Sequence, residues 1–258
     1  MVTAVLYNCN FTGFFKGKIY KGEIKKACVP GLNCYSCPGA VGACPLGSVQ
    51  SALVTSKVRF PYYILGLLIL FGVLWGRFVC GFLCPFGLLQ ELLYKIPGKK
   101  VRKNKVTRIL SYLKYVVLVV LVVIVPLCFK VPGFCKFICP QGTLEGGVLL
   151  GITNPSVRGM LGRVFTWKVL VAVSVLAATV FVFRCFCRFL CPLGAFYSLF
   201  NKISFCRMEV DDEKCNHCNA CERFCKMDIK KVGDRECVQC GECAKVCERN
   251  AISRKKSF

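Results

Sequence analysis

Two runs of cysteines near the C-terminal end constrain this chain more than any other feature. The first run has cysteines at positions 215, 218, 221 and 225, and the second has them at 237, 240, 243 and 247. Both runs have two, two and three residues between successive cysteines. Thiolates bind soft metals, and short regular spacings indicate metal ligands rather than disulfide pairs. The last fifty residues are therefore predicted to fold around metal.

The eight cysteines predict two [4Fe–4S] clusters with crossed ligands. In this spacing, typical of bacterial two-cluster ferredoxins, the fourth cysteine of each run binds the other run's cluster. We expect cluster A on Cys215, Cys218, Cys221 and Cys247, and cluster B on Cys237, Cys240, Cys243 and Cys225. His217 lies beside a ligand but is not expected to bind, because both ligand sets are complete without it. The alternative is two zinc sites of four cysteines each.

The rest of the chain is unusually apolar. The sequence is 55% hydrophobic with a mean hydropathy of +0.55, whereas soluble domains are about 45–50% apolar. Three apolar runs approach the roughly 20 residues that cross a bilayer, at 60–79, 109–129 and 164–183. The alternative is that these runs are buried helices of a soluble protein.

Charge predicts how these spans are oriented. The loop Lys95–Arg108 has seven basic residues and no acidic one, which predicts a cytoplasmic loop. The C-terminal tail is then cytoplasmic and the N-terminal segment lies outside, although lysines between positions 16 and 26 argue against that placement. The net charge of +23 is assigned to membrane orientation and to compensation of anionic clusters, not to nucleic-acid binding.

An internal repeat divides the chain further. Residues 77–87 match residues 184–194 without a gap, and both contain Cys-x3-Cys-Pro-x-Gly directly after an apolar span. A second pair of Cys-Pro-x-Gly segments begins at Cys44 and Cys139, ahead of the first and third spans. We therefore expect a cysteine-rich segment with a candidate re-entrant helix (1–58), a membrane domain with a parallel repeat (59–208) and a two-cluster domain (209–258).

The repeat predicts two further sets of cysteines. An inner set at the cytoplasmic end contains Cys80, Cys84, Cys187 and Cys191, enough for a [4Fe–4S] cluster or a binuclear site. A candidate outer set at the opposite end contains Cys34, Cys37, Cys44, Cys135 and Cys139. Ala40 stands where the first cysteine of an outer Cys-x3-Cys pair is needed, so either Cys34 or Cys37 supplies that ligand. The alternative for both sets is that the cysteines are small packing residues.

The segments CGFLCPFG and CRFLCPLG, each after a span and combined with the two-cluster tail, resemble the NapH/NosR-type membrane polyferredoxins. The resemblance covers most of residues 34–250. It implies electron-transfer subunits that connect quinol or cytoplasmic donors with periplasmic or membrane oxidoreductases. The segment NCYSCPGAVGACPLG departs from the NapH pattern, which has a clear first span there.

We therefore expect an α-helical protein of the cell membrane with an α+β tail that transfers electrons. Its expected partners are a soluble ferredoxin or flavoprotein donor and a membrane or extracytoplasmic redox partner, with quinone as a candidate. No nucleophile–base pair or phosphate loop occurs in the sequence, so a subunit is expected rather than a complete enzyme. The alternatives are a metal-delivery or maturation factor, a quinol-oxidising subunit and a structural anchor. The 22 cysteines favour an anaerobic, reducing cell.

Overall fold

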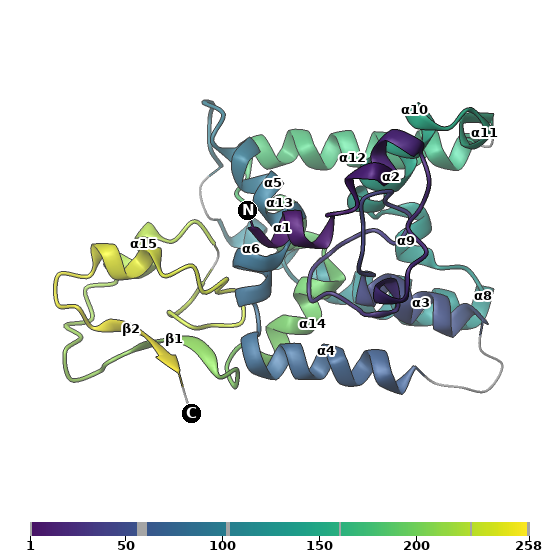
Figure 1. The fold of residues 1–258 in the computed structure, drawn as a ribbon. Helices are drawn as coiled ribbons and strands as arrows, with labels where there is room; N and C mark the ends of the chain where they lie inside the picture. Colours follow the sequence, from purple (N-terminus) through teal and green to yellow (C-terminus); the bar gives the residue numbers. More distant parts are fainter. Residues whose placement is uncertain (1, 56–60, 102–103, 160, 228, 257–258) are drawn as a thin grey trace.

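The computed structural model describes residues 2–55, 61–101, 104–159, 161–227 and 229–256. A body of helices carries a small C-terminal domain, the tail, at one end (Figure 1). Several residues covered by the sequence predictions lie outside the described ranges, namely Phe60 of the first span, Arg102 and Lys103 of the basic loop, and Asp228, Ser257 and Phe258 of the tail.

The body is built from short and medium helices. They are α1 (Val2–Tyr7), α2 (Phe11–Lys16), α3 (Pro45–Thr55), α4 (Tyr62–Trp75), α5 (Pro85–Tyr94), α6 (Lys105–Leu110), α7 (Leu113–Val117), α8 (Val125–Phe129), α9 (Gly133–Phe137), α10 (Leu149–Thr153), α11 (Pro155–Gly159), α12 (Arg163–Phe181), α13 (Cys185–Phe189) and α14 (Pro192–Phe200). Between them lie the π-helical segments η2 (Val79–Leu83), η3 (Leu118–Ile124) and η4 (Gly142–Val148), and the 3₁₀ turn η1 (Glu23–Lys26).

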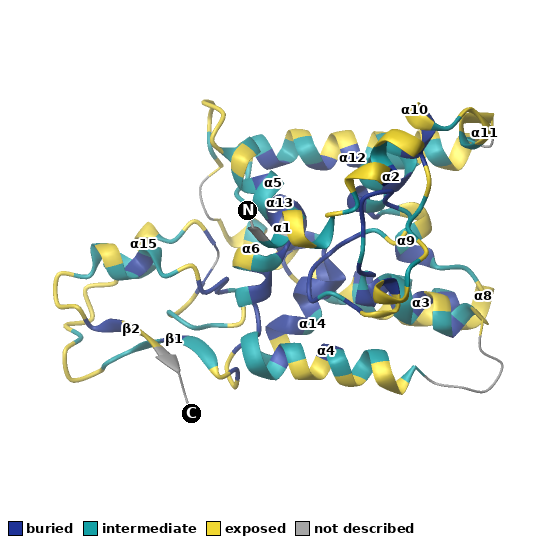
Figure 2. Cartoon of the chain, in the orientation of Figure 1, coloured by how far each residue is buried: buried dark blue, intermediate teal, exposed yellow. Residues whose placement is uncertain are grey.

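Among the described residues, two helical segments are long and apolar enough to cross a membrane. They are Lys105–Phe129, which joins α6, α7, η3 and α8, and Arg163–Phe181, which is α12. Only 22% and 17% of their most apolar stretches are buried, so they are not core helices. Apolar side chains such as Ile109 and Leu170 are 71% and 61% exposed, and exposed residues recur along α12 in Figure 2. Large exposed apolar surfaces mark contact with a membrane or a partner.

The first predicted span, 60–79, differs from expectation. Its helix α4 has 14 residues and ends before Gly76, whose φ of +51° breaks the helix. The shorter α4 is apolar but falls below the length that crosses a membrane unaided. The expected short helix ahead of this span is present as α3.

The body has one main apolar core. It includes Phe86, Phe134 and Phe186, which are at most 1% exposed, together with cysteines of both halves. The ring of Phe186 meets Phe86 edge to face at 5.1 Å between centroids and lies 6.3 Å from Phe134. Aromatic residues from α5, α9 and α13 therefore join the two halves at the centre.

The tail is a small α+β unit, in agreement with the predicted mixed domain. Strands β1 (Cys206–Val210) and β2 (Ile252–Lys256) pair antiparallel, with Met208 opposite Arg254. The helix α15 (Ala220–Phe224) and the 3₁₀ turn η5 (Glu242–Val246) each follow part of a cysteine run. The apolar interior is limited to two small groups around Met227 and Met208. So little core indicates that metal must supply much of the stability of the tail.

Candidate cluster-binding sites

Four cysteines converge in the body next to the tail, and we call them the inner site: Cys80, Cys84, Cys187 and Cys191. None is more than 8% exposed. The first pair lies on η2 and the turn after it, and the second on α13 and the turn after it. Pro85 and Pro192 then start α5 and α14, where a residue without an N–H is tolerated. The structure thus brings together the four residues predicted as the inner set.

The thiols of the inner site influence one another. Burial, together with the neighbouring Cys187 and Cys80, raises the pKa of Cys84 to about 12. The backbone N–H of Gly194 donates to Sγ of Cys191 at 3.3 Å. Four neighbouring buried cysteines can all be thiolates only if cationic charge is present, which the iron of a [4Fe–4S] cluster supplies. The donor set therefore fits such a cluster.

Two buried arginines from matched positions of the repeat border this site. Arg184 Nη1 donates to the carbonyl oxygen of Cys80 at 2.5 Å, and Arg77 Nη2 donates to that of Cys187 at 3.4 Å. Each arginine thus reaches into the opposite half. Within the described ranges, the buried Nε of each has no hydrogen-bond partner. Unused donors on buried cations fit an anionic cluster, which carries roughly −2 with its four thiolates.

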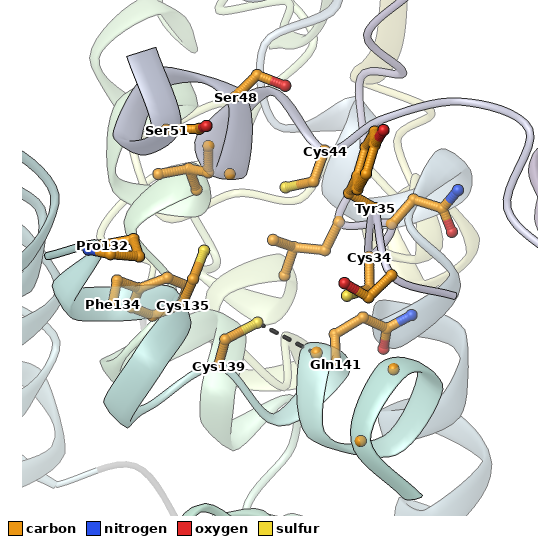
Figure 3. Close-up of a pocket in the computed structure, with 18 of the residues that line it drawn as sticks. Cys34, Tyr35, Cys44, Ser48, Ser51, Pro132, Phe134, Cys135, Cys139 and Gln141 are labelled. Atoms are coloured by element: carbon orange, nitrogen blue, oxygen red, sulfur yellow. Dashed lines mark hydrogen bonds between the residues drawn. The ribbon is translucent and has the colours of Figure 1, made fainter. Parts of the chain in front are cut away.

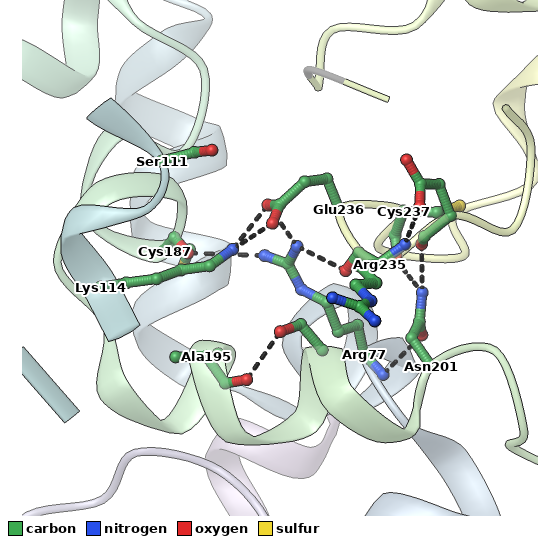
Figure 4. Close-up of polar contacts among 12 residues, drawn as sticks. Arg77, Ser111, Lys114, Cys187, Ala195, Asn201, Arg235, Glu236 and Cys237 are labelled. Atoms are coloured by element: carbon green, nitrogen blue, oxygen red, sulfur yellow. Dashed lines mark hydrogen bonds and ion pairs between the residues drawn. The ribbon is translucent and has the colours of Figure 1, made fainter. Parts of the chain in front are cut away.

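A buried charge network connects the inner site to the tail (Figure 4). The carboxylate of Glu236 accepts from Lys114 Nζ at 2.5 and 2.6 Å and from Arg77 Nη1 at 2.8 Å. Burial by itself would raise the pKa of Glu236, but the two cations outweigh it and lower the pKa below its usual value. Because Glu236 directly precedes Cys237, Arg77 links an inner cysteine to the neighbour of a predicted cluster B ligand.

The backbones of the two regions also touch. Asn201 Nδ2, just after α14, donates to the carbonyl oxygen of Cys237 at 2.9 Å. A Cβ atom added at Gly81 would lie only 2.6 Å from the carbonyl oxygen of Val238. Gly81 stands between two inner-site cysteines, and Val238 follows Cys237. Only glycine permits this approach, so the cluster B loop lies directly on the inner site.

A second group of four cysteines lines a cavity of about 890 Å³ in the other part of the body. We call these four the outer site: Cys34, Cys44, Cys135 and Cys139 (Figure 3). A Cβ atom at Gly142 would lie 3.6 Å from Sγ of both Cys34 and Cys139. Burial, with the neighbouring Cys44 and Cys34, raises the pKa of Cys135 to about 12. This donor set also fits a [4Fe–4S] cluster.

Cys37 is not among the residues that line this cavity. It is 1% exposed, and its Sγ donates to Oδ1 of Asn8 at 3.6 Å. Of the two cysteines left open by the sequence, the structure therefore brings Cys34 to the outer site. Cys37 lies three residues further along a tight turn, in which its N–H donates to the Cys34 carbonyl.

Two buried glutamines contact these sites and were not predicted. Gln90 of α5 donates to Sγ of Cys187 at 3.0 Å, and Gln50 of α3 donates to Sγ of Cys135 at 3.3 Å. Both are 0% exposed. A signal was present in the sequence, because Cys-Pro-x-Gly-x-x-Gln occurs at both 44–50 and 84–90.

The inner and outer sites adjoin one another. Leu32 forms a backbone hydrogen bond with the Cys84 thiol, and Cys34, two residues later, lines the outer cavity. Phe134 directly precedes Cys135 of the outer site, and Phe186 directly precedes Cys187 of the inner site. A short loop and an aromatic pair therefore span the space between the two sites.

The tail arranges its cysteines in two groups. Cys225 packs against the apolar group that contains Cys237, and both Cys221 and Cys247 pack against the group that contains Cys243. The crossed assignment of the eight cysteines to clusters A and B stays a prediction. His217 Nδ1 lies 4.0 Å from Sγ of Cys215 on an exposed turn.

Across the described ranges, no three His, Cys, Asp or Glu side chains are arranged to hold a single metal ion. In a [4Fe–4S] cluster each thiolate binds its own iron, so the four sulfur atoms stand apart.

Comparison with known proteins identifies related sequences. A family model described as a 4Fe-4S binding domain matches residues 58–104, 114–150 and 162–207, and each segment contains one Cys-x3-Cys-Pro motif. The uncharacterized protein MJ0750 of Methanocaldococcus jannaschii is 31% identical over 193 residues, which are 72% of this chain and 74% of that protein.

Two other relatives carry descriptive names. The methylamine utilization ferredoxin-type protein MauN of Methylorubrum extorquens is 29% identical over 70% of this chain and 59% of MauN. The regulatory protein NosR of Pseudomonas aeruginosa is 29% identical over 60% of this chain and 21% of NosR, which confirms the NosR-type resemblance. The chain thus spans only a fifth of NosR. No solved structure matches it.

Proposed function

Because this chain belongs to the 4Fe-4S binding domain family, we propose that it is a membrane iron–sulfur electron carrier. Its clusters are A and B in the tail, one at the inner site and one at the outer site. A bound [4Fe–4S] cluster supplies reversible one-electron chemistry. The chain's own residues hold the clusters, keep them close together and bury the inner one away from water.

The contact between the tail and the inner site carries this proposal. Gly81 lies against the Val238 carbonyl, and Arg77 bonds both the Cys187 carbonyl and Glu236. Cluster B, which includes Cys237 among its ligands, is then the tail cluster nearest to the inner cluster. A carrier needs neighbouring clusters in a water-excluded path, and these buried contacts supply it.

The path continues from the inner to the outer site. The loop from Leu32 to Cys34 and the Phe134–Phe186 pair connect the two, and both lie in or beside the main core. The open cavity at the outer site leaves room for an acceptor, for which a quinone or an extracytoplasmic redox protein is proposed. At the other end Cys218 is exposed, which favours a soluble ferredoxin or flavoprotein as the partner of cluster A.

The exposed apolar surfaces of Lys105–Phe129 and Arg163–Phe181 support a membrane location. The basic loop Lys95–Arg108 supports a cytoplasmic tail. Lys100 in this loop donates to the Val180 carbonyl at 2.7 Å, so the loop lies at the C-terminal end of α12.

The substitution Cys84→Ala tests the proposal. We expect iron content to fall by about four atoms per chain while the electron paramagnetic resonance (EPR) signals of both tail clusters persist. Cys128→Ala, at an exposed cysteine of α8, is the matched control and should change neither. Unchanged iron and EPR signals in Cys84→Ala would refute an inner cluster, and copper near stoichiometry in the purified protein would favour metal delivery instead.

A further inference from the structure

We propose that Gln50 and Gln90 are matched positioning residues, each of which orients one cysteine and raises the reduction potential of the cluster at its site. This inference rests on the proposed function, because it requires clusters at the inner and outer sites. It assigns a role to two buried side chains that neither the cysteine motifs nor the charge network uses.

Gln90 makes three hydrogen bonds at the inner site. Its Oε1 accepts from the backbone N–H of Phe186 at 3.0 Å, and its Nε2 donates to Sγ of Cys187 at 3.0 Å. The same Nε2 lies 3.4 Å from the carbonyl oxygen of Phe86, one turn back in its own helix. The amide therefore fixes both the backbone before Cys187 and the sulfur of Cys187.

Gln50 makes the same bonds at the outer site. Its Oε1 accepts from the backbone N–H of Phe134 at 3.0 Å, and its Nε2 donates to Sγ of Cys135 at 3.3 Å. The same Nε2 lies 3.4 Å from the carbonyl oxygen of Leu46, one turn back in α3. Both glutamines stand six residues after a cysteine that starts a helix, and both act on the first cysteine of a Cys-x3-Cys-Pro pair in another element.

The orientation of each amide follows from its neighbours. A backbone N–H can only donate, so the oxygen of the amide must face Phe186 or Phe134. The NH₂ group is then directed to the sulfur. Burying an amide costs free energy unless its groups are paired, and a hydrophobic residue would fill the same space without that cost. Two independent occurrences of the same arrangement indicate a role toward the sulfur.

Hydrogen bonds to cluster sulfur tune the reduction potential. The reduced cluster is the more anionic form, so an N–H donated to its thiolate stabilises it more than the oxidised form. Loss of that donor should shift the potential to more negative values. Because each glutamine contacts only one site, each shift should be confined to that site.

The test uses the full-length protein and potentiometric EPR titration. Cys187→Ala and Cys135→Ala first identify the inner and outer signals. Methionine is an unbranched helix former of similar length, so Gln90→Met and Gln50→Met remove the bonds with little change in volume. We expect Gln90→Met to lower only the inner potential and Gln50→Met only the outer one, with iron content retained.

Each variant serves as the control for the other. Unchanged potentials with full iron content would overturn the proposal, as would a shift of both sites in both variants. If Gln90→Met loses its iron, Gln90→Glu keeps an acceptor for Phe186 but replaces the amide donor, and an unaltered inner potential there would overturn the proposal. A wild-type protein that lacks both signals would instead refute the proposed function.

Discussion

The inner and outer sites are built alike but have different surroundings. Each takes cysteines from a Cys-x3-Cys-Pro turn and from the start of another helix, and each has a glutamine on one sulfur. The inner site is surrounded by buried side chains that include Arg77 and Tyr197, both 0% exposed. The outer site opens into a cavity whose wall includes Ser48, Ser51 and Lys168.

The comparison distinguishes two tasks of such a site. One is to hold a cluster, and the other is to exchange electrons with another molecule. In the proposed carrier, the shared turns and glutamines would serve the first task. In the proposed carrier, the buried inner site, which contacts the tail, would pass electrons between two clusters of the same chain. The outer site has free volume beside its thiols, and in the proposed carrier it would meet a second molecule. The following changes test that division.

The largest expected effect distinguishes Cys34 from Cys37. Cys34→Ala should remove the outer cluster, with a loss of about four iron atoms per chain, because it removes one of four thiolates around the cavity. Cys37→Ala should keep its iron, because that thiol bonds Asn8 instead. Iron analysis measures both, and loss of iron in Cys37→Ala alone would reverse the assignment.

The next effect concerns the sealed side of the inner site. Glu236→Gln leaves Arg77 and Lys114 buried without a counter-charge, which costs about 3–5 kcal/mol. We expect faster hydrogen exchange across residues 229–243 and slower electron transfer from the tail, while outer-site signals stay the same.

Glu91→Gln provides the matched control for that variant. Glu91 pairs with Arg184 at 2.9 Å, but its side chain is 41% exposed, so the loss should stay below about 1 kcal/mol. An equal loss of stability in the two variants would show that burial of the Glu236 network does not add to its contribution.

The smallest effect comes from the glycine at the tail contact. Gly81→Ala adds a Cβ atom 2.6 Å from the Val238 carbonyl and should cost about 1–3 kcal/mol through overpacking. The rate of electron transfer between the tail and inner clusters should fall, as measured by flash reduction. Gly66→Ala, with nothing within 4 Å of its Cβ position, should have no effect, and an equal loss there would point to general helix damage.

Sequence reasoning identified the cysteines of the inner site because the repeat places identical motifs after apolar spans. It left Cys34 and Cys37 unresolved, because the choice depends on which way a turn faces and not on spacing. It missed Gln50, Gln90 and Glu236, whose partners lie 85, 97 and 122 or more residues away. It also made the first span too long, because the positive φ of Gly76 is set by packing near Asn201 and Ser204.

The contact at Gly81 also has a consequence for how the protein is put together. A carbonyl group that lies so close to a glycine backbone fits only one shape of the loop from Cys237 to Cys240. In ferredoxin-like loops that shape is set by the iron they enclose. We therefore expect the tail to receive its iron before it docks, so that maturation proceeds from the C-terminal clusters to the joined whole.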